Sequence, residues 1–320
     1  MKRALALGAI LVGACSSPNL SPDAVRGALP QAASTQISAP TATGGTAAVR
    51  GLGAGGDLVP ASAVGDVSGY FVSTVTLAVA VNGSVAWSLG VLEAVVALPP
   101  TSCKEDGCTW GPGSHPLDPR DWKLTVTKVG DRFDYELAGQ LKSAPTGFVT
   151  VLSGQAWPGG APHRGHGSFF VDHEAGKALG FTDTGTLEVT YDNRTALSIG
   201  ATLLGFTDAS APYHVGNAVY AYAEGPTGGD LQVAFHDLTS TADPRLALHS
   251  RWAFDGAGRG DAAYSQAAPA ASYTAAECWS PATTAPPFRV VFYLDSAGAT
   301  SGAEASCAFA PGEPPTLTAP

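Results

Sequence analysis

The chain has 320 residues, of which 17 are basic and 27 acidic, so its formal net charge at pH 7 is −10. This charge argues against nucleic acid or anionic lipid headgroups as partners, because both need a basic face. Only 14% of the residues are charged, while 39 are glycine and 24 are proline. That composition is typical of a strand-and-turn protein with flexible tails rather than of a helix-rich enzyme.

Residues 1–14 have the pattern of a secretory signal peptide. Lys2 and Arg3 form its charged end, residues 4–12 its apolar core, and Gly13 and Ala14 the small residues before a cleavage site. The pattern predicts an exported protein. An ordinary secretory peptide with an incidental cysteine at position 15 is the alternative.

Residues 11–15, Leu-Val-Gly-Ala-Cys, resemble the lipobox of bacterial lipoproteins. The resemblance implies cleavage before Cys15 and attachment of palmitate-type acyl chains to this residue, and two chains already anchor a protein stably. Ser16 stands where lipoproteins kept in the inner membrane often have Asp, so the resemblance implies an outer-membrane address in the bacterial cell envelope. The partner implied is the membrane itself, reached through the lipid.

Residues 15–65 contain mostly Ala, Ser, Thr, Pro and Gly, with few large side chains. Such a segment buries too little apolar surface to order itself, so we predict a lipidated, disordered tether. The last ten residues, 311–320, hold four prolines and are predicted to be a disordered tail. A single β-rich domain is expected between them, over residues 66–310.

Residues 70–98 form the longest apolar stretch and carry one charge, Glu93. Apolar residues recur at helical spacing and Pro99-Pro100 follows, which favours a helix buried against the rest of the domain. Asn82-Gly83 at its centre also fits a hairpin turn, and the length also fits a membrane span, so these two remain as alternatives.

After this stretch, apolar residues alternate with polar ones in about eleven short segments separated by turn residues. The segments lie at residues 122–126, 133–141, 148–152, 167–172, 187–191, 197–203, 218–222, 231–235, 246–252, 273–279 and 290–294. The pattern predicts a mainly β fold with one long helix: an antiparallel sheet of about eleven strands, curled into a half-barrel around that buried helix.

Three elements carry a further resemblance. They are residues 252–262, Trp-Ala-Phe-Asp-Gly-Ala-Gly-Arg-Gly-Asp-Ala; Glu277-Cys278-Trp279; and Leu-Pro-Pro-Thr-Ser at 98–102 ahead of Trp-Gly-Pro at 110–112. Their order resembles a group of uncharacterised lipoproteins from high-GC bacteria, over most of residues 66–310. The predicted architecture is loosely similar to that of half-barrel lipoprotein carriers, which implies an apolar ligand.

Four cysteines remain once Cys15 is set aside. An even number in an exported protein favours disulfides, and we pair Cys103 with Cys108 and Cys278 with Cys307. Four thiolates without paired C-x-x-C spacing make a zinc site the weaker interpretation.

His163, His166 and His173 form the one histidine cluster of the sequence. Imidazoles so spaced could ligate zinc or copper, although the glycine-rich segment 158–167 also fits exposed loop histidines. Neither G-x-S-x-G nor S-x-x-K occurs. We therefore predict no catalytic residues, no metal, no cofactor and no enzyme, and keep a metal-dependent enzyme using the three histidines as the second alternative.

Two other features of the sequence allow more than one interpretation. Residues 256–261, Gly-Ala-Gly-Arg-Gly-Asp, match neither a phosphate loop nor a calcium loop and favour a tight turn with Arg259 paired to a carboxylate or to carbonyls. The six tryptophans fit a ligand cavity or core packing equally well. The sequence favours a non-enzymatic envelope lipoprotein that binds a lipid or other apolar ligand, with a protein-interaction or structural module as the alternative.

Overall fold

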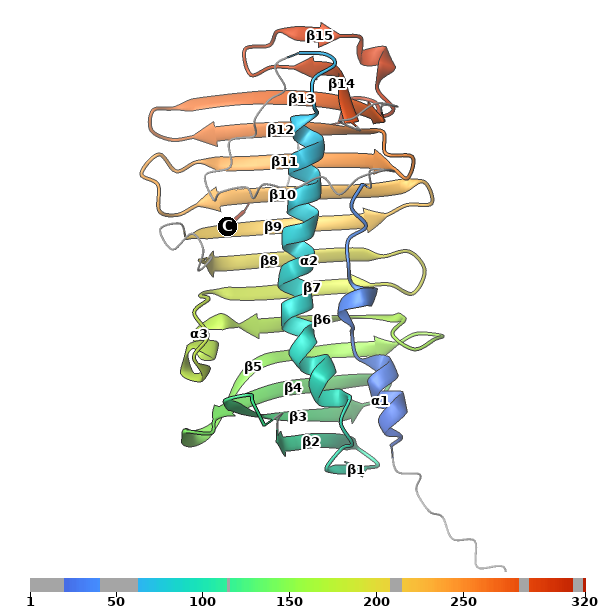
Figure 1. The fold of residues 1–320 in the computed structure, drawn as a ribbon, viewed down its shortest axis with the longest axis vertical. Helices are drawn as coiled ribbons and strands as arrows, with labels where there is room; N and C mark the ends of the chain where they lie inside the picture. The colour runs from blue at the N-terminus through green and yellow to red at the C-terminus, as the bar shows by residue number, and fades with distance from the viewer. Residues whose placement is uncertain (1–19, 41–62, 114–115, 208–214, 282–287, 313–318) are drawn as a thin grey trace, which may run out of the picture.

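The structure is a computed structural model that describes residues 20–40, 63–113, 116–207, 215–281, 288–312 and 319–320. Within these residues the chain forms one long helix, α2 (Gly69–Val96), and an antiparallel sheet of fifteen strands. The helix runs along one face of the sheet, across the strands (Figure 1). The predicted mainly β class with one long helix is therefore confirmed.

The sheet follows the chain in order, since each strand pairs antiparallel with the next. The strands are β1 (Ser102–Lys104), β2 (Gly107–Gly113), β3 (Arg120–Val129), β4 (Arg132–Leu141), β5 (Ala144–Pro158), β6 (Gly165–Asp172), β7 (Thr186–Asp192), β8 (Ser198–Phe206), β9 (Gly216–Glu224), β10 (Gly228–Asp237), β11 (Arg245–Ala253), β12 (Gly258–Gln266), β13 (Ala271–Pro281), β14 (Phe288–Leu294) and β15 (Thr300–Gly302). The predicted antiparallel sheet is confirmed, but the strand number of about eleven is wrong.

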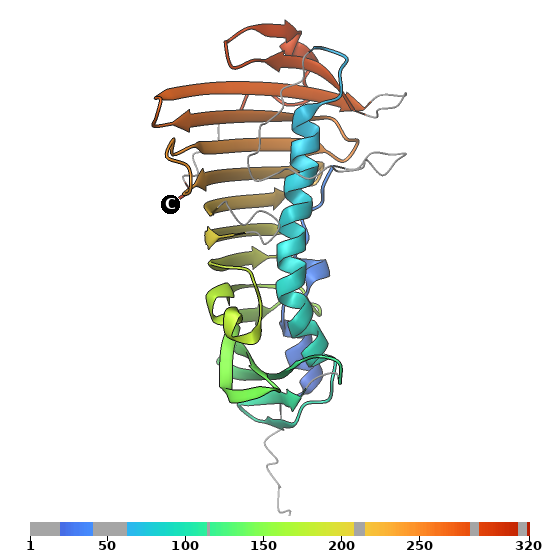
Figure 2. The ribbon, with the colours of Figure 1, turned by 60° about the vertical axis from the view of Figure 1, so that its left-hand side comes forward.

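The sheet does not close, because β1 and β15 are its two edges. Strands β1, β2, β12 and β15 are the four that the sequence pattern did not predict. Turned by 60°, the sheet is seen as a long ladder behind α2, which lies against one face and is not enclosed (Figure 2).

One face of the sheet carries the core. On β3, Trp122, Leu124 and Val126 are buried and alternate with more exposed polar residues, and on β7 Leu187 and Val189 do the same. Side chains alternate between the two faces of a strand, so these residues all point toward α2. The opposite face, called here the outer face, is mainly polar.

Ser68 caps the start of helix α2, since its hydroxyl accepts a hydrogen bond from the Phe71 amide at 3.0 Å, and the helix ends at Val96, shortly before Pro99. The hairpin alternative is wrong, since Asn82 and Gly83 lie in mid-helix. Of the described residues, α2 is the one helix long and apolar enough to cross a bilayer by length and composition, and 39% of its most apolar window is buried. The helix is thus buried on one side, whereas the sequence predicted a buried helix inside a curled sheet.

Residues 20–40 are folded, which corrects the tether prediction for this part of the chain. They contain α1 (Pro22–Ala28) and the 3-10 turn η1 (Ala32–Ser34), and they bury Val25, Leu29 and Ile37. The signal peptide, the lipobox and residues 41–62 lie outside the described residues.

The polar side chains of α2 hold residues 20–40 in place. The Asn82 side chain pairs with the backbone of Ile37, accepting its N–H at 2.7 Å and donating to its carbonyl at 2.9 Å. Glu93 accepts the amide of Ala32 at 2.6 Å, and Arg26 donates to the Val96 carbonyl at the end of α2 at 2.7 Å. The polar interruptions of the apolar stretch are therefore docking groups for the preceding segment.

The N-terminal end of α2 rests on buried polar groups of β11 and β13. Glu277, 1% exposed, accepts hydrogen bonds from the Ser68 hydroxyl and from the Tyr70 amide. A carboxylate at a helix N-terminus also interacts favourably with the helix dipole. The Thr74 and Ser250 hydroxyls are bonded at 2.5 Å.

Residues 258–266 form strand β12 and not the predicted tight turn. Arg259, 3% exposed, donates to Asp261 at 2.9 Å, so the predicted carboxylate partner is confirmed. Asp261 also accepts from Arg251 at 3.0 Å. The strand is rich in glycine because a Cβ at Gly260 would lie 2.6 Å from Cδ1 of Tyr70 and one at Gly258 would lie 2.2 Å from the Trp279 ring.

The last two residues also depart from the disordered-tail prediction. Ala319 is buried, and the Pro320 carbonyl accepts hydrogen bonds from Asn217 at 2.6 Å and from His236 at 3.0 Å. Three short helical elements complete the described fold. They are α3 (His173–Gly176) and η2 (Lys177–Leu179) after β6, and η3 (Glu304–Ser306) after β15.

Candidate functional site

The outward side of α2 is an apolar stripe. Val72, Val79, Trp87 and, just past the helix, Leu98 are 37%, 54%, 43% and 52% exposed. Their separations of 7, 8 and 11 residues place them on one side of the helix. At 1.5 Å per residue, the stripe from Val72 to Leu98 is about 39 Å long. We call these four residues the α2 stripe.

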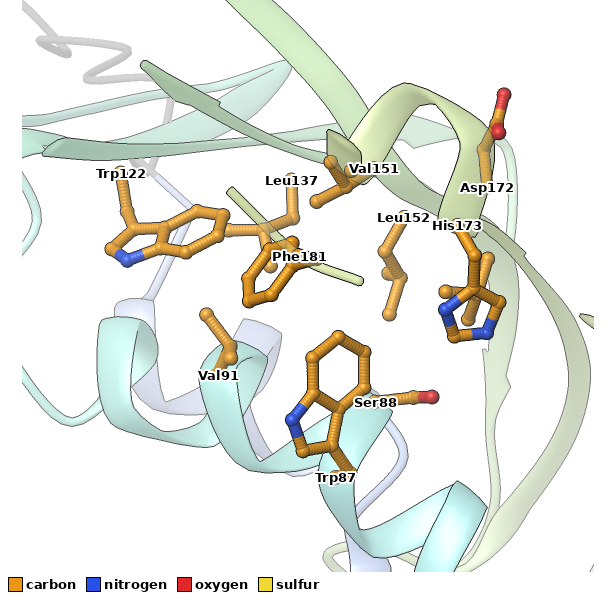
Figure 3. A pocket seen from close by; sticks show the side chains of 12 residues that line it. Trp87, Ser88, Val91, Trp122, Leu137, Val151, Leu152, Asp172, His173 and Phe181 are labelled. Atoms are coloured by element: carbon orange, nitrogen blue, oxygen red, sulfur yellow. The ribbon is translucent and has the colours of Figure 1, made fainter. Parts of the chain in front are cut away.

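Beneath Trp87 a small pocket lies between α2 and the sheet (Figure 3). Its lining comes from α2, from β3 to β6 and from the segment around α3: Trp87, Ser88, Val91, Trp122, Leu137, Val151, Leu152, Val171, Asp172, His173, Gly176 and Phe181. The enclosed volume is about 20 Å³, enough for about one water molecule. Pockets for drug-sized ligands are about 300–1,000 Å³, so this one holds no acyl chain as it stands.

Aromatic rings form the wall of the pocket nearest the solvent. Phe181 meets Trp87 edge-on at 5.1 Å between ring centroids and stacks toward Trp122 at 6.4 Å. The guanidinium carbon of Arg120 lies 4.2 Å from the centroid of the Phe181 ring. Because Trp87 is 43% exposed, displacement of the Trp87 ring would open the pocket onto the α2 stripe.

Of the titratable residues that line this pocket, His173 is the most deeply buried. It is 6% exposed and stacks with Trp87 at 5.8 Å. Burial lowers the pKa of its imidazole, while the nearby Asp183, Asp172 and Glu174 carboxylates oppose the shift. The ring is therefore neutral at pH 7, and its buried Nδ1 has no hydrogen-bond partner among the described residues.

Other polar groups of the pocket are already engaged. Asp172 points away from the cavity in Figure 3 and caps α3 by accepting the Ala175 amide at 2.8 Å. The Ser88 hydroxyl donates to the Ser84 carbonyl at 2.9 Å. The pocket can therefore exclude water and offer one imidazole hydrogen bond, and its serine is committed to the helix backbone.

The structure does not bring the three predicted histidines together. His163 contacts the Leu29 carbonyl at 3.2 Å, and His166 stacks on Trp157 on the outer face at 5.1 Å, while His173 faces α2. Among the described residues, no group of three or more His, Cys, Asp and Glu side chains could hold a metal ion. The alternative of a metal-dependent enzyme on this cluster has no geometric basis.

Both predicted cysteine pairs are confirmed. Cys103 and Cys108 lie opposite each other on β1 and β2 with sulfurs 2.08 Å apart, and the Cys278 and Cys307 sulfurs are 2.15 Å apart. Cys15, the predicted lipid attachment site, is outside the described residues.

The tryptophans divide between core and surface. Trp110, Trp122, Trp252 and Trp279 are at most 5% exposed and belong to the hydrophobic core. Trp87 belongs to the candidate site, which the helical pattern alone could not show, because Phe181 and His173 reach it from a turn almost ninety residues later. The one signal in the sequence was a histidine directly after the predicted strand 167–172, followed by a segment with several glycines.

Comparison with known proteins adds no relative to this description. No protein-family model, curated protein or solved structure matches the chain. The lipoprotein resemblance of the sequence accordingly remains a prediction.

Proposed function

We propose that this protein is a non-enzymatic, lipid-anchored envelope protein that binds an apolar ligand of the acyl-chain type along the α2 stripe. The observation that carries the proposal is the stripe itself: a 28-residue helix with one charged residue leaves an apolar side exposed along its whole length. An exposed apolar surface of this kind marks a binding site more often than an inert face.

The shape of the stripe favours an acyl chain over a broad partner surface. It is about 39 Å long but only one side chain wide, whereas a stable protein interface buries about 800 Å² on each partner. Trp87 at its middle leads to the pocket with the neutral His173, which can hydrogen-bond a polar head group. We therefore propose that the ligand lies on the outward side of α2 and not between the helix and the sheet.

A second candidate is a protein-interaction module on the same stripe. It is favoured by the size of the enclosed pocket, about 20 Å³, since a carrier usually shields its ligand in a cavity. The two functions separate experimentally, because only the first needs a bound small molecule.

The test uses the mature chain and a fluorescent long-chain fatty acid. Val79→Asp places a carboxylate in the stripe and should weaken binding at least tenfold, because the charge must be desolvated against the acyl chain. Val129→Asp, at a position 42% exposed on the distant β3–β4 turn, is the matched control and should bind like the parent protein. Equal binding by both variants would place the ligand elsewhere, and no acyl binding by the parent would favour the interaction module.

The anchor is tested separately. Metabolic labelling with an alkyne analogue of palmitate should mark the parent protein in the outer-membrane fraction. Cys15→Ser should abolish the label and leave the protein unprocessed at its signal peptide. A labelled Cys15→Ser protein would contradict the proposed attachment site.

A further inference from the structure

The outer face of β5 to β8 carries a groove that is separate from the α2 stripe. It is an open hollow of about 320 Å³ whose lining includes Trp157, His166, Ser168, Thr190, Asp192, Ser198 and Gly200. On these strands the alternate residues, such as Phe169 and Val189, are buried toward α2. The groove therefore opens on the side of the sheet away from the helix.

Strand register sets these residues in two adjacent rows. Trp157, His166, Asp192 and Ser198 are neighbours across four consecutive strands. Ser168, Thr190 and Gly200 form the next row on the same face. Since a row runs across the strands at about 4.8 Å per strand, each is about 10–15 Å long.

The first row begins with stacked rings. The Trp157 and His166 rings are 5.1 Å apart and 9° from parallel, and the guanidinium carbon of Arg132 lies 5.7 Å from the centroid of the Trp157 ring. These contacts hold the two rings in place at one end of the groove, where they form a rigid wall. Such a wall offers C–H and ring contacts to a ligand at little cost in side-chain entropy.

Asp192 supplies a fixed hydrogen-bond acceptor. Arg194 donates to both of its carboxylate oxygens, with contacts of 2.5 to 3.2 Å, and these bonds lower the Asp192 pKa to about 2. The carboxylate is thus ionised at any physiological pH while its charge is balanced by its neighbour. Hydroxyls of Ser168, Thr190 and Ser198 add groups that both donate and accept.

We propose that this groove binds a neutral saccharide. Its polar groups are hydroxyls and one paired carboxylate, which suit the many hydroxyls of a sugar ring, and its aromatic wall suits the apolar C–H edge of the same ring. The volume lies at the lower end of the range of small-molecule sites. The paired Asp192 and Arg194 leave little net charge to attract an anion.

Gly200 gives a clean way to fill the groove. A Cβ at this position would lie 3.0 Å from the Thr190 Oγ1 and would meet no backbone atom within 4 Å. Gly200→Val should therefore fold normally and occupy the hollow. Thr202→Val, two residues further along β8 on the same face, is the matched control.

The experiment is saturation-transfer NMR on the mature full-length chain with neutral tetrasaccharides of glucose, mannose, galactose and N-acetylglucosamine, and a uronic-acid tetrasaccharide for comparison. We expect a neutral sugar to bind the parent protein and Thr202→Val alike, and Gly200→Val and Trp157→Ala to bind it at least tenfold more weakly. Val79→Asp should leave sugar binding unchanged, which separates this site from the α2 stripe.

Three results would overturn the proposal. The first is no signal from any neutral tetrasaccharide at 10 mM, and the second is selective binding of the uronic-acid sugar. The third is equal affinity in Gly200→Val and the parent. Urea unfolding of each variant verifies that lost binding is not lost folding.

Discussion

The two ends of α2 contact the sheet in different ways, although hydrogen bonds to residues 20–40 also hold the C-terminal end. At its N-terminal end, near β11 to β13, directional bonds join the helix to buried polar groups, among them Glu277 under Ser68 and Thr74 against Ser250. At its C-terminal end, near β2 and β3, the buried Leu89 and Leu92 belong to an apolar core that includes Trp110. Bonds fix position and direction, whereas apolar contacts tolerate displacement better. We therefore expect rearrangement around a ligand near Trp87 and not near Ser68.

At the N-terminal end of α2, we expect the substitution of Arg259 to have the largest effect on stability. Arg259→Met leaves the buried Asp261 with one ion-pair partner fewer. It also removes the ion-pair partner of Glu304, which lies 3.0 Å from Arg259. Breaking a buried ion pair in this way costs about 3–5 kcal/mol of unfolding free energy, measured by urea titration.

The matched control is Arg194→Met, which removes an exposed pair and should cost at most about 1 kcal/mol. Similar losses of unfolding free energy in both variants would show that the N-terminal end of α2 depends on ion pairs no more than the surface does.

The two disulfides sharpen the comparison, because one lies at each end. Cys278 and Cys307 are 29 residues apart and Cys103 and Cys108 only 5. By loop-closure entropy, replacing the first pair with alanine should cost about 3–4 kcal/mol and replacing the second about 2 kcal/mol. Equal midpoints in urea for the two double variants would contradict this ranking.

The smallest expected effect is a pH dependence of stability that arises from His173, near the C-terminal end of α2. Because burial lowers its pKa when folded, the unfolded chain binds a proton first as pH falls below about 6.5, the ordinary histidine value. Stability from this group is thus complete above that pH and is lost on acidification toward the folded-state pKa. The measurement is the urea midpoint at pH 7.5 and 5.5.

His173→Phe keeps a ring against Trp87 and should lose less stability between these two pH values than the parent. An unchanged acid response in His173→Phe would assign the pH dependence to other groups.

The sequence predicted the parts of this fold that local pattern controls. Helical spacing and Pro99-Pro100 located α2, alternation located eleven strands, and cysteine spacing gave both disulfides. These signals depend on neighbours in the chain, where periodicity and turn chemistry act.

The missed parts depend on contacts between distant residues. Strand β12 has the composition of a turn because Tyr70 and Trp279 pack directly on its glycines. Residues 20–40 have few large side chains, yet Val25, Leu29 and Ile37 each find a buried position. In the candidate site, Trp87 lies within the helix that the sequence predicted. Its contact with Phe181 and His173, however, arises from tertiary packing alone.

The strictly sequential sheet has a consequence for how its length can vary. Because each strand bonds only to its predecessor and successor, a hairpin inserted or deleted between β7 and β10 would alter one local interface and leave the remaining registers intact, as in a repeat array. The two terminal strands have three residues each, and such short edges offer little template for another chain. The sheet is thus extensible inside one molecule while its ends are poor starting points for a fibre.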